Sequence, residues 1–226
     1  MAETKKKQAT PTLEESQNQS EAFLLKYKNA LICCVVVLIL IVCGCIWYSD
    51  YQSGKQDEAS TAMAKAQDHF QNGNFELALN GDSLSTAGFL KIANDYSSTK
   101  AGNLASLYAG LCYANMEKWE EAAQYLAQFN SEDDQMISPA ALGALGNAYA
   151  HLNQLDKAVS TLISAAEKAD NNSISPTFLI QAGQILESQG KKAEALKLYK
   201  QVKEKYFDSM QTQYQTIDEY IERVSE

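Results

Sequence analysis

Three glycines recur at a nearly constant interval in the second half of this 226-residue chain. Gly110, Gly146 and Gly183 are 36 and 37 residues apart, and each is followed twelve residues later by an alanine (Ala122, Ala158 and Ala195). Self-similarity at a period of about 20 to 50 residues is the sequence signature of repeat architectures. Small residues at matching places let two helices pack closely. The spacing therefore predicts an all-α solenoid in which each repeat is a pair of antiparallel helices.

Two of the repeats begin with the same dipeptide. Ser138-Pro139 and Ser175-Pro176 are 37 residues apart. Serine is a favoured N-cap, and proline suits the first turn of a helix, where its missing N–H would have no partner in any case. We therefore expect each serine to cap the first helix of its repeat.

This pattern resembles the tetratricopeptide repeat, a helix-turn-helix unit of about 34 residues. The resemblance implies three units, over residues 103–136, 139–172 and 176–209. The matching residues are Gly110, Tyr113, Ala122 and Leu126 in the first unit, Leu142, Leu145, Gly146, Tyr149, Ala158 and Leu162 in the second, and Gly183, Gly190, Ala195 and Tyr199 in the third. The sequence departs from the family pattern at Ser106, where an aromatic residue is usual, and at Asp170 and Phe207, near which proline is common.

A degenerate copy over residues 59–100 precedes these units. Ala66, Gly73, Phe75 and Ala78 follow the order of one unit, but Ala78 and Ala122 are 44 residues apart. We place the additional residues at 80–87, where the sequence is typical of a turn. We expect a delayed second helix over residues 89–96.

Apolar residues at helical spacing also continue beyond the third unit. They are Met210, Tyr214, Ile217, Ile221 and Val224. This stripe predicts a single capping helix over residues 210–226 that shields the apolar edge of the last unit.

Residues 30–48 form a run of 19 residues without a charge. A helix of that length spans about 28 Å, close to the thickness of a bilayer core. We interpret residues 29–49 as a transmembrane signal anchor and residues 1–28 as a polar, basic and disordered leader. Five lysines precede the run (Lys5, Lys6, Lys7, Lys26 and Lys28), and only two follow it closely (Lys55 and Lys65). The positive-inside rule then predicts a cytoplasmic N-terminus and an exported domain over residues 50–226.

The cysteines allow an alternative to the anchor. Val42-Cys43-Gly44-Cys45 approaches the sequence that precedes a lipid-modified cysteine, and cleavage before Cys45 would give an exported lipoprotein. The long leader and the cysteine at position 43 count against this alternative. Only Cys112 lies in the exported part, so that part cannot form an internal disulfide and must be stabilised by packing.

The sequence gives little support for catalysis. His69 and His151 are the only histidines, and neither has a partner at metal-ligand spacing, so we interpret both as surface residues. No glycine-rich phosphate loop is present. The exported part carries 14 basic and 24 acidic residues, a formal charge of −10, which is the wrong sign for nucleic-acid binding. We expect no enzyme activity, no cofactor, no metal, no nucleic acid and no small-molecule substrate.

The first helices of stacked hairpins line a concave face, so this face is the candidate protein-binding groove. In the repeat register its lining residues are Leu107, Leu111, Asn115, Asn147, His151, Ile180, Gln184 and Glu187. Packing against a neighbouring helix is an equally good interpretation of Leu107, Leu111 and Ile180, because repeats bury most of their large apolar residues.

The layout of a basic stub, one anchor and an exported acidic repeat domain resembles the bacterial YfgM-like family, which is associated with the inner-membrane Sec translocon and with periplasmic chaperones. The resemblance implies a non-catalytic scaffold, anchored in the inner membrane and facing the periplasm, whose partners are translocon subunits, periplasmic chaperones or exported chains.

Two other roles remain open. Residues 89–126 also resemble exported repeat proteins of outer-membrane assembly and cell-division coordination, a role that lipidation at Cys45 would favour. A mitochondrial import receptor would share the anchor and the repeats, but it would hold the repeats in the cytosol, against the lysine asymmetry.

Overall fold

The computed structural model describes residues 13–82 and 86–225, with side chains from residue 26 onward except Leu31. Within these ranges all regular secondary structure is helical, apart from an isolated bridge between Gly81 and Ala87. The all-α class predicted from the sequence is therefore confirmed. The chain divides into two compact units, residues 1–53 and 54–226.

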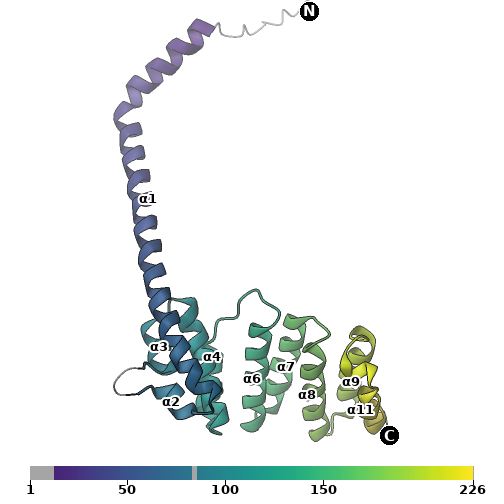
Figure 1. Ribbon diagram of the computed structural model, residues 1–226. Coiled ribbons are helices and arrows are strands. Elements are labelled where there is room, and N and C mark those ends of the chain that lie inside the picture. Colours follow the sequence, from purple (N-terminus) through teal and green to yellow (C-terminus); the bar gives the residue numbers. More distant parts are fainter. Residues whose placement is uncertain (1–12, 83–85, 226) are drawn as a thin grey trace, which may run out of the picture. The chain divides into compact units, whose positions relative to one another are not determined.

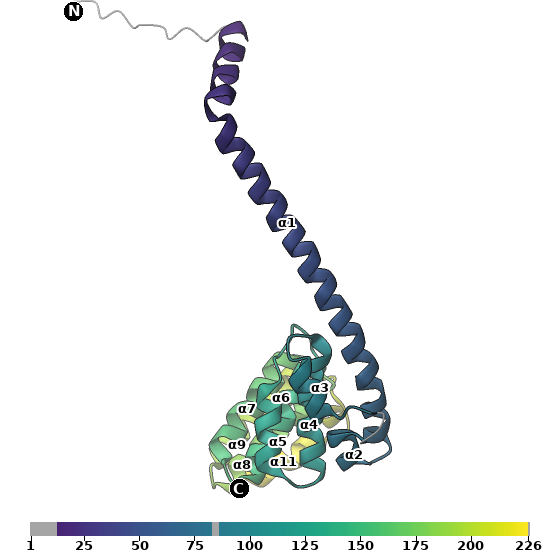
Figure 2. The same ribbon diagram turned by 90° about the vertical axis from the view of Figure 1, so that its left-hand side faces the viewer.

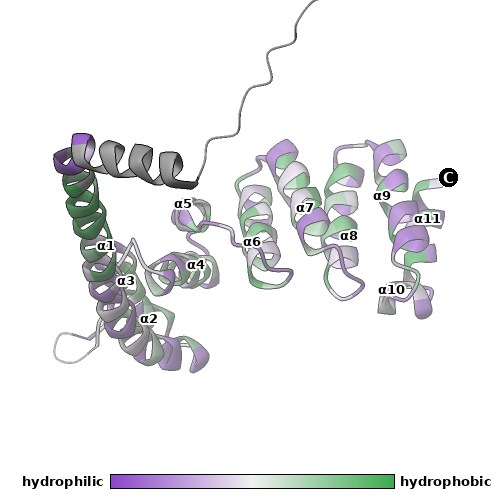
Figure 3. Cartoon of the chain, turned by 90° about the horizontal axis from the view of Figure 1, so that it is seen from above, coloured by the Kyte–Doolittle hydropathy of each residue, from purple (hydrophilic) through white to green (hydrophobic). Residues whose placement is uncertain are grey.

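The first unit consists of the N-terminal part of α1 (Leu13–Gln71), the longest helix in the described chain. The large apolar side chains described between residues 32 and 51 are exposed, among them Leu40 at 66% and Trp47 at 71%. This helix is long and apolar enough to cross a membrane, and Figure 3 shows its apolar stretch in green.

The leader differs from the sequence-based expectation. We expected residues 1–28 to be disordered, but α1 already begins at Leu13. Neither glycine nor proline occurs between Pro11 and Gly44, so the sequence has no strong helix breaker there. Residues 1–12 lie outside the described part of the chain.

The second unit contains three regular helical hairpins, which stand side by side in Figure 1 and behind one another in Figure 2. They pair α4 (Lys100–Asn115) with α5 (Trp119–Gln128), α6 (Ile137–His151) with α7 (Leu155–Ala169), and α8 (Ser175–Ser188) with α9 (Lys192–Lys205).

The three repeated glycines occupy matching places in these hairpins. A Cβ atom added to Gly110 would lie 2.6 Å from Leu126 Cγ, one added to Gly146 would lie 2.8 Å from Leu162 Cγ, and one added to Gly183 would lie 2.3 Å from the ring of Tyr199. Each contacted residue is sixteen positions further along, in the second helix of the same hairpin. Close helix approach is therefore the reason for the repeat.

The turns of these three hairpins, and the turn between α1 and α2 (Phe75–Asn80), have the same backbone conformation. One residue in each turn has a positive φ, namely Gly73, Glu117, Asn153 and Gly190. The next residue donates its backbone N–H to the carbonyl five positions back, as in the bond from Gln154 to Tyr149 of 2.8 Å. This is the Schellman arrangement, which reverses the chain after the first helix.

The first hairpin is irregular. Residues 54–71 of α1 pair with α2 (Phe75–Asn80), and after the segment 81–88 the chain continues as α3 (Phe89–Asp95). A Cβ atom on Gly88 would lie 2.3 Å from Gly81 N, so the two glycines permit the crossing of the segment's ends. Residues 83–85 lie outside the described part.

The predicted serine caps are wrong. Ser138 and Ser175 lie inside the first turns of α6 and α8, fully buried, and the cap positions are Met136 and Ile174. Asp134 accepts the N–H bonds at the start of α6 instead. The Ser175 hydroxyl donates to the carbonyl of Ala166 and accepts from Asn171 N–H, so it ties α8 to the end of α7. Proline lies in the first turn as expected.

The cap also differs from the prediction of a single helix. It consists of α10 (Met210–Gln213) and α11 (Thr216–Ser225), separated by Gln215, which has a φ of +58°. Ile217 and Val224 are buried in the last core cluster, whereas Tyr214 is 72% exposed. The apolar spacing from Met210 to Val224 continues across the break between α10 and α11, so the sequence pattern does not reveal this break.

Candidate functional site

The first helices α4 and α6 form the walls of an apolar pocket of about 490 Å³. Its lining residues are Phe70, Leu104, Leu107, Tyr108, Leu111, Met136, Ile137, Ala140 and Ala141. Leu107 is 7% exposed, so most of its surface packs against neighbours, while Leu111 is half-buried. We call this hollow the apolar pocket.

A second hollow of about 430 Å³ lies between the C-terminal parts of α4 and α6 and reaches α8. Its lining residues are Ala114, Asn115, Trp119, Ala144, Asn147, Ala150, His151 and Gln181. Three primary amides among eight residues give it hydrogen-bonding capacity without charge. We call it the amide pocket.

An aromatic pair forms one wall of the amide pocket. The rings of Trp119 and His151 lie 3.6 Å apart and are parallel within 1°. Trp119 begins α5 and His151 ends α6, so the stack joins two successive hairpins. His151 is exposed, as we expected for a surface histidine, but its ring has a specific aromatic partner.

The three amides differ in their partners. Asn115 donates its Nδ2 to the carbonyl of Leu111 at 2.8 Å, and its side-chain oxygen accepts no bond within the described ranges. Asn147 makes no side-chain hydrogen bond there, and the Oε1 atom of Gln181 is buried without a partner. An extended peptide backbone, which offers alternating donors and acceptors, is a suitable ligand for such groups.

The remaining three predicted groove residues lie against the cap. Ile180 is 8% exposed and belongs to the last core cluster. Gln184 donates Nε2 to the Tyr220 hydroxyl at 3.4 Å, and Glu187 is paired with Arg223 of α11. The structure therefore gathers Leu107, Leu111, Asn115, Asn147 and His151 around the two pockets, and it separates Ile180, Gln184 and Glu187 from them.

Cys112 is buried in α4, and burial raises the pKa of its thiol to about 12, so it stays protonated at neutral pH. Across residues 26–82 and 86–225, no group of three or more His, Cys, Asp or Glu side chains is placed to hold a metal ion.

Several lining residues were not predicted from the sequence, among them Trp119, Gln181, Met136 and Ile137. One signal was present for Trp119, because it is the only tryptophan outside the apolar run and it directly follows a hairpin turn. Gln181 carried no such signal, since its repeat equivalents are Tyr108 and Ala144.

Stacked hairpins with a recurring turn define an α-solenoid, and the comparisons with known proteins give its family. The family model described as a tetratricopeptide repeat-like domain matches residues 21–214. The chain therefore belongs to the family of tetratricopeptide repeat-like domains, as the sequence resemblance implied. The fold of this family is that of a protein–protein interaction scaffold, and such folds are typically non-catalytic.

Solved structures are similar at the level of the fold. Two crystal structures of nearly identical tetratricopeptide-like repeats, assigned to a kinesin light chain of Podosopora anserina, each match with a TM-score of 0.52 and 15% identity. Each match covers 75% of this chain and 94% of the other, and one of the two carries the substitution Q17M. No curated protein sequence matches this chain. At 15% identity the likeness shows the fold alone.

Proposed function

We propose that this protein is a non-catalytic, membrane-anchored scaffold that binds an extended protein segment in the apolar and amide pockets. The proposal rests on one observation: two hollows of different chemistry share the walls α4 and α6. Leu107 and Leu111 offer apolar contact for side chains, and Asn115 and Asn147 offer hydrogen bonds to a peptide backbone. Ile180, Gln184 and Glu187, which the sequence also assigns to this face, are not part of the proposed surface, because Ile180 is buried and the other two contact the cap.

The apolar run of α1 supports the anchoring. A helix that exposes a long run of uncharged residues is costly in water and favourable in a bilayer. The lysine asymmetry supports a cytoplasmic N-terminus and repeats on the opposite, periplasmic side. The YfgM-like layout suggests the translocon and periplasmic chaperones as partners, and the inner membrane as the location.

Site-specific photocrosslinking in native membranes tests the binding surface. A benzophenone amino acid at Asn147 should yield protein adducts, whereas one at Ser164, exposed on α7, should not. Mass spectrometry of the adducts should identify translocon subunits, periplasmic folding factors or exported chains. Equal adduct patterns at both positions would show that the pockets are not the binding surface.

Topology has its own test. A protease should degrade residues 54–226 in cells with an opened outer membrane and spare them in intact cells. Degradation only after complete lysis would contradict the periplasmic location. An intact mass that begins at a diacylated Cys45 would instead favour the second candidate, an exported lipoprotein of outer-membrane assembly or cell-division coordination.

A further inference from the structure

The exposed large apolar side chains of the repeat domain are unevenly distributed. Among the described residues from 54 onward they are Met136, Ile137, Phe207, Met210 and Tyr214. Met136 and Ile137 lie where the α5–α6 connection enters α6, and Phe207 and Met210 lie where the α9–α10 connection enters α10. The turns inside the hairpins, at 72–74, 116–118, 152–154 and 189–191, hold none of them.

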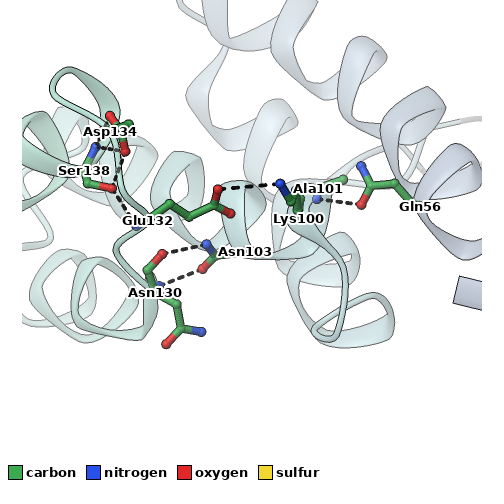
Figure 4. Close-up of polar contacts among 8 residues, drawn as sticks. All are labelled: Gln56, Lys100, Ala101, Asn103, Asn130, Glu132, Asp134 and Ser138. Carbon is green, nitrogen blue, oxygen red and sulfur yellow. Dashed lines mark hydrogen bonds and ion pairs between the residues drawn. The ribbon is translucent and has the colours of Figure 1, made fainter. Parts of the chain in front are cut away.

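A chain of polar contacts places these connections on one edge of the domain. Gln56 Oε1, near the start of the domain, accepts from Ala101 N–H at 3.2 Å. Asn103 and the backbone of Asn130 exchange two hydrogen bonds of 2.8 and 2.7 Å. Lys100 and Glu132 form an ion pair of 3.8 Å. Figure 4 shows these contacts running from α1 across α4 to the segment before α6.

The same chain of contacts continues to the end of the repeats. Asn171 donates Nδ2 to the carbonyl of Gln135 at 3.2 Å. Its neighbour Asp170 pairs with Lys205 at 2.7 Å. We call the surface along these contacts the anchor-side edge. It comprises the connections 96–99, 129–136, 170–174 and 206–209, together with Gly54, where the domain begins.

We propose that the anchor-side edge rests on the surface of the lipid bilayer, with Met136, Ile137, Phe207 and Met210 in contact with lipid. The inference rests on the membrane anchoring proposed above. Only eight residues of uninterrupted helix, about 12 Å, separate Tyr48 at the end of the apolar run from Gln56. A connection this short limits how far the edge can lie from the bilayer that the anchor crosses.

The exposure of these four apolar side chains agrees with contact to a lipid bilayer. Ile137 is 51% exposed and Met210 is 67% exposed, although fully buried positions are common for both residue types. Apolar side chains at the tip of a connection gain by burial at the headgroup boundary, as do those of interfacial helices. The edge carries acids, among them Asp133 and Asp208, and its bases Lys100 and Lys205 are paired with Glu132 and Asp170, so we propose apolar contact and not attraction to anionic lipid as the driving force.

Photocrosslinking to lipid tests the inference in the full-length protein, reconstituted in phosphatidylcholine vesicles. A benzophenone amino acid is placed at Ile137 or Met210, and matched probes are placed at Glu120 and Ala193, both exposed beside turns at the opposite edge. We expect lipid adducts at positions 137 and 210 in at least five-fold higher yield than at 120 and 193. All four positions are exposed, so the substitutions should leave the fold intact.

A fifth probe at Val37, in the apolar run, separates the two proposals. Lipid adducts at 37 with equal yields at the other four positions would overturn the inference and leave the anchoring intact. Protein adducts in place of lipid adducts at 210, which lines neither pocket, would also overturn it. A probe at 37 that captures no lipid would remove the anchoring, and the inference with it.

Discussion

Arg223 in α11 forms a two-pronged ion pair with Glu187 in α8. Arg223 Nε lies 2.8 Å from Glu187 Oε2, and Nη2 lies 2.8 Å from Oε1. The two residues are 36 positions apart, which is the repeat period, because α11 takes the place of the first helix of a further unit. The guanidinium of Arg223 and the Tyr199 hydroxyl both donate to Glu187 and hold the pKa of its carboxyl below the usual value.

Replacement of Arg223 by alanine should loosen the cap. Glu187 is 18% exposed and would lose both guanidinium bonds, while Arg223 is 52% exposed, so solvent screening moderates the loss. We expect the free energy of unfolding to fall by about 1–2 kcal/mol, and hydrogen exchange in α11 to accelerate. Lys203→Ala is the control, because its pair with Asp218 is exposed on both sides and should contribute less than about 0.5 kcal/mol. Negligible effects of both substitutions would show that apolar contacts alone hold α11.

Gly146→Ala should destabilise the middle hairpin. The new Cβ would lie 2.8 Å from Leu162 Cγ and 3.3 Å from the backbone nitrogen of Leu162, so the two helices must move apart. We expect a net loss of about 1–2 kcal/mol, because overpacking outweighs the higher helix propensity of alanine. Gly54→Ala provides the control: Gly54 also lies within a helix, but nothing surrounds its Cβ position within 4 Å, so stability should stay equal or rise. Thermal unfolding of both variants decides, and a stable Gly146→Ala variant would refute the role of close approach.

The repeated fold was predictable because its determinant is a local pattern of small residues. Gly110, Gly146 and Gly183 must be small where α5, α7 and α9 cross them, and this need recurs at the repeat period. The caps were not predictable in the same way. Ser138 matches the composition of an N-cap, but Asp134 competes successfully for the same N–H groups from outside the helix. Only the path of the chain through 129–136 decides between them.

Acid should remove the contribution of Asp134 to stability. Partial burial raises the pKa of its carboxyl, but bonds from the Ser138 hydroxyl and from the N–H groups of Met136, Ser138 and Ile137 outweigh burial and lower the pKa to about 2. Because the folded-state pKa is depressed, the stabilisation is complete above about pH 4, the ordinary carboxyl value, and is lost as the pH falls toward 2.

The comparison of Asp134→Asn with the unchanged protein tests this sign. At pH 7 the variant should be less stable by about 1 kcal/mol, the usual contribution of an N-cap. Denaturant unfolding repeated at pH 2.5 should show a much smaller difference between the two. Asp133→Asn, at an exposed neighbouring position, should change stability little at either pH. A difference that persists undiminished at low pH would contradict the capping role of the carboxylate.

The candidate site was predictable only in part, since the repeat register assigns residues to a face but does not show what covers it. Leu111 and Asn147 were assigned to the face of the first helices and border the pockets there. Gln184 occupies the same repeat position as Asn147, yet the side chain of Gln184 contacts Tyr220 of the cap. A further helix at the end of the stack thus changes the surroundings of one repeat, and no periodic pattern encodes that difference.

Gln181→Leu should separate stability from binding. The Gln181 Oε1 atom is buried without a hydrogen-bond partner among the described residues, which is a cost in the unliganded protein. Leucine has a similar size and removes that acceptor, so the free energy of unfolding should stay equal or rise by up to about 1 kcal/mol.

If the amide pocket binds a peptide backbone, the same substitution should reduce adduct formation by the probe at Asn147 several-fold. The matched variant Gln154→Leu alters an exposed turn residue outside both pockets and should leave the adducts unchanged. A Gln181→Leu protein that is stable and still captures partners at the original yield would show that the buried oxygen has no part in recognition.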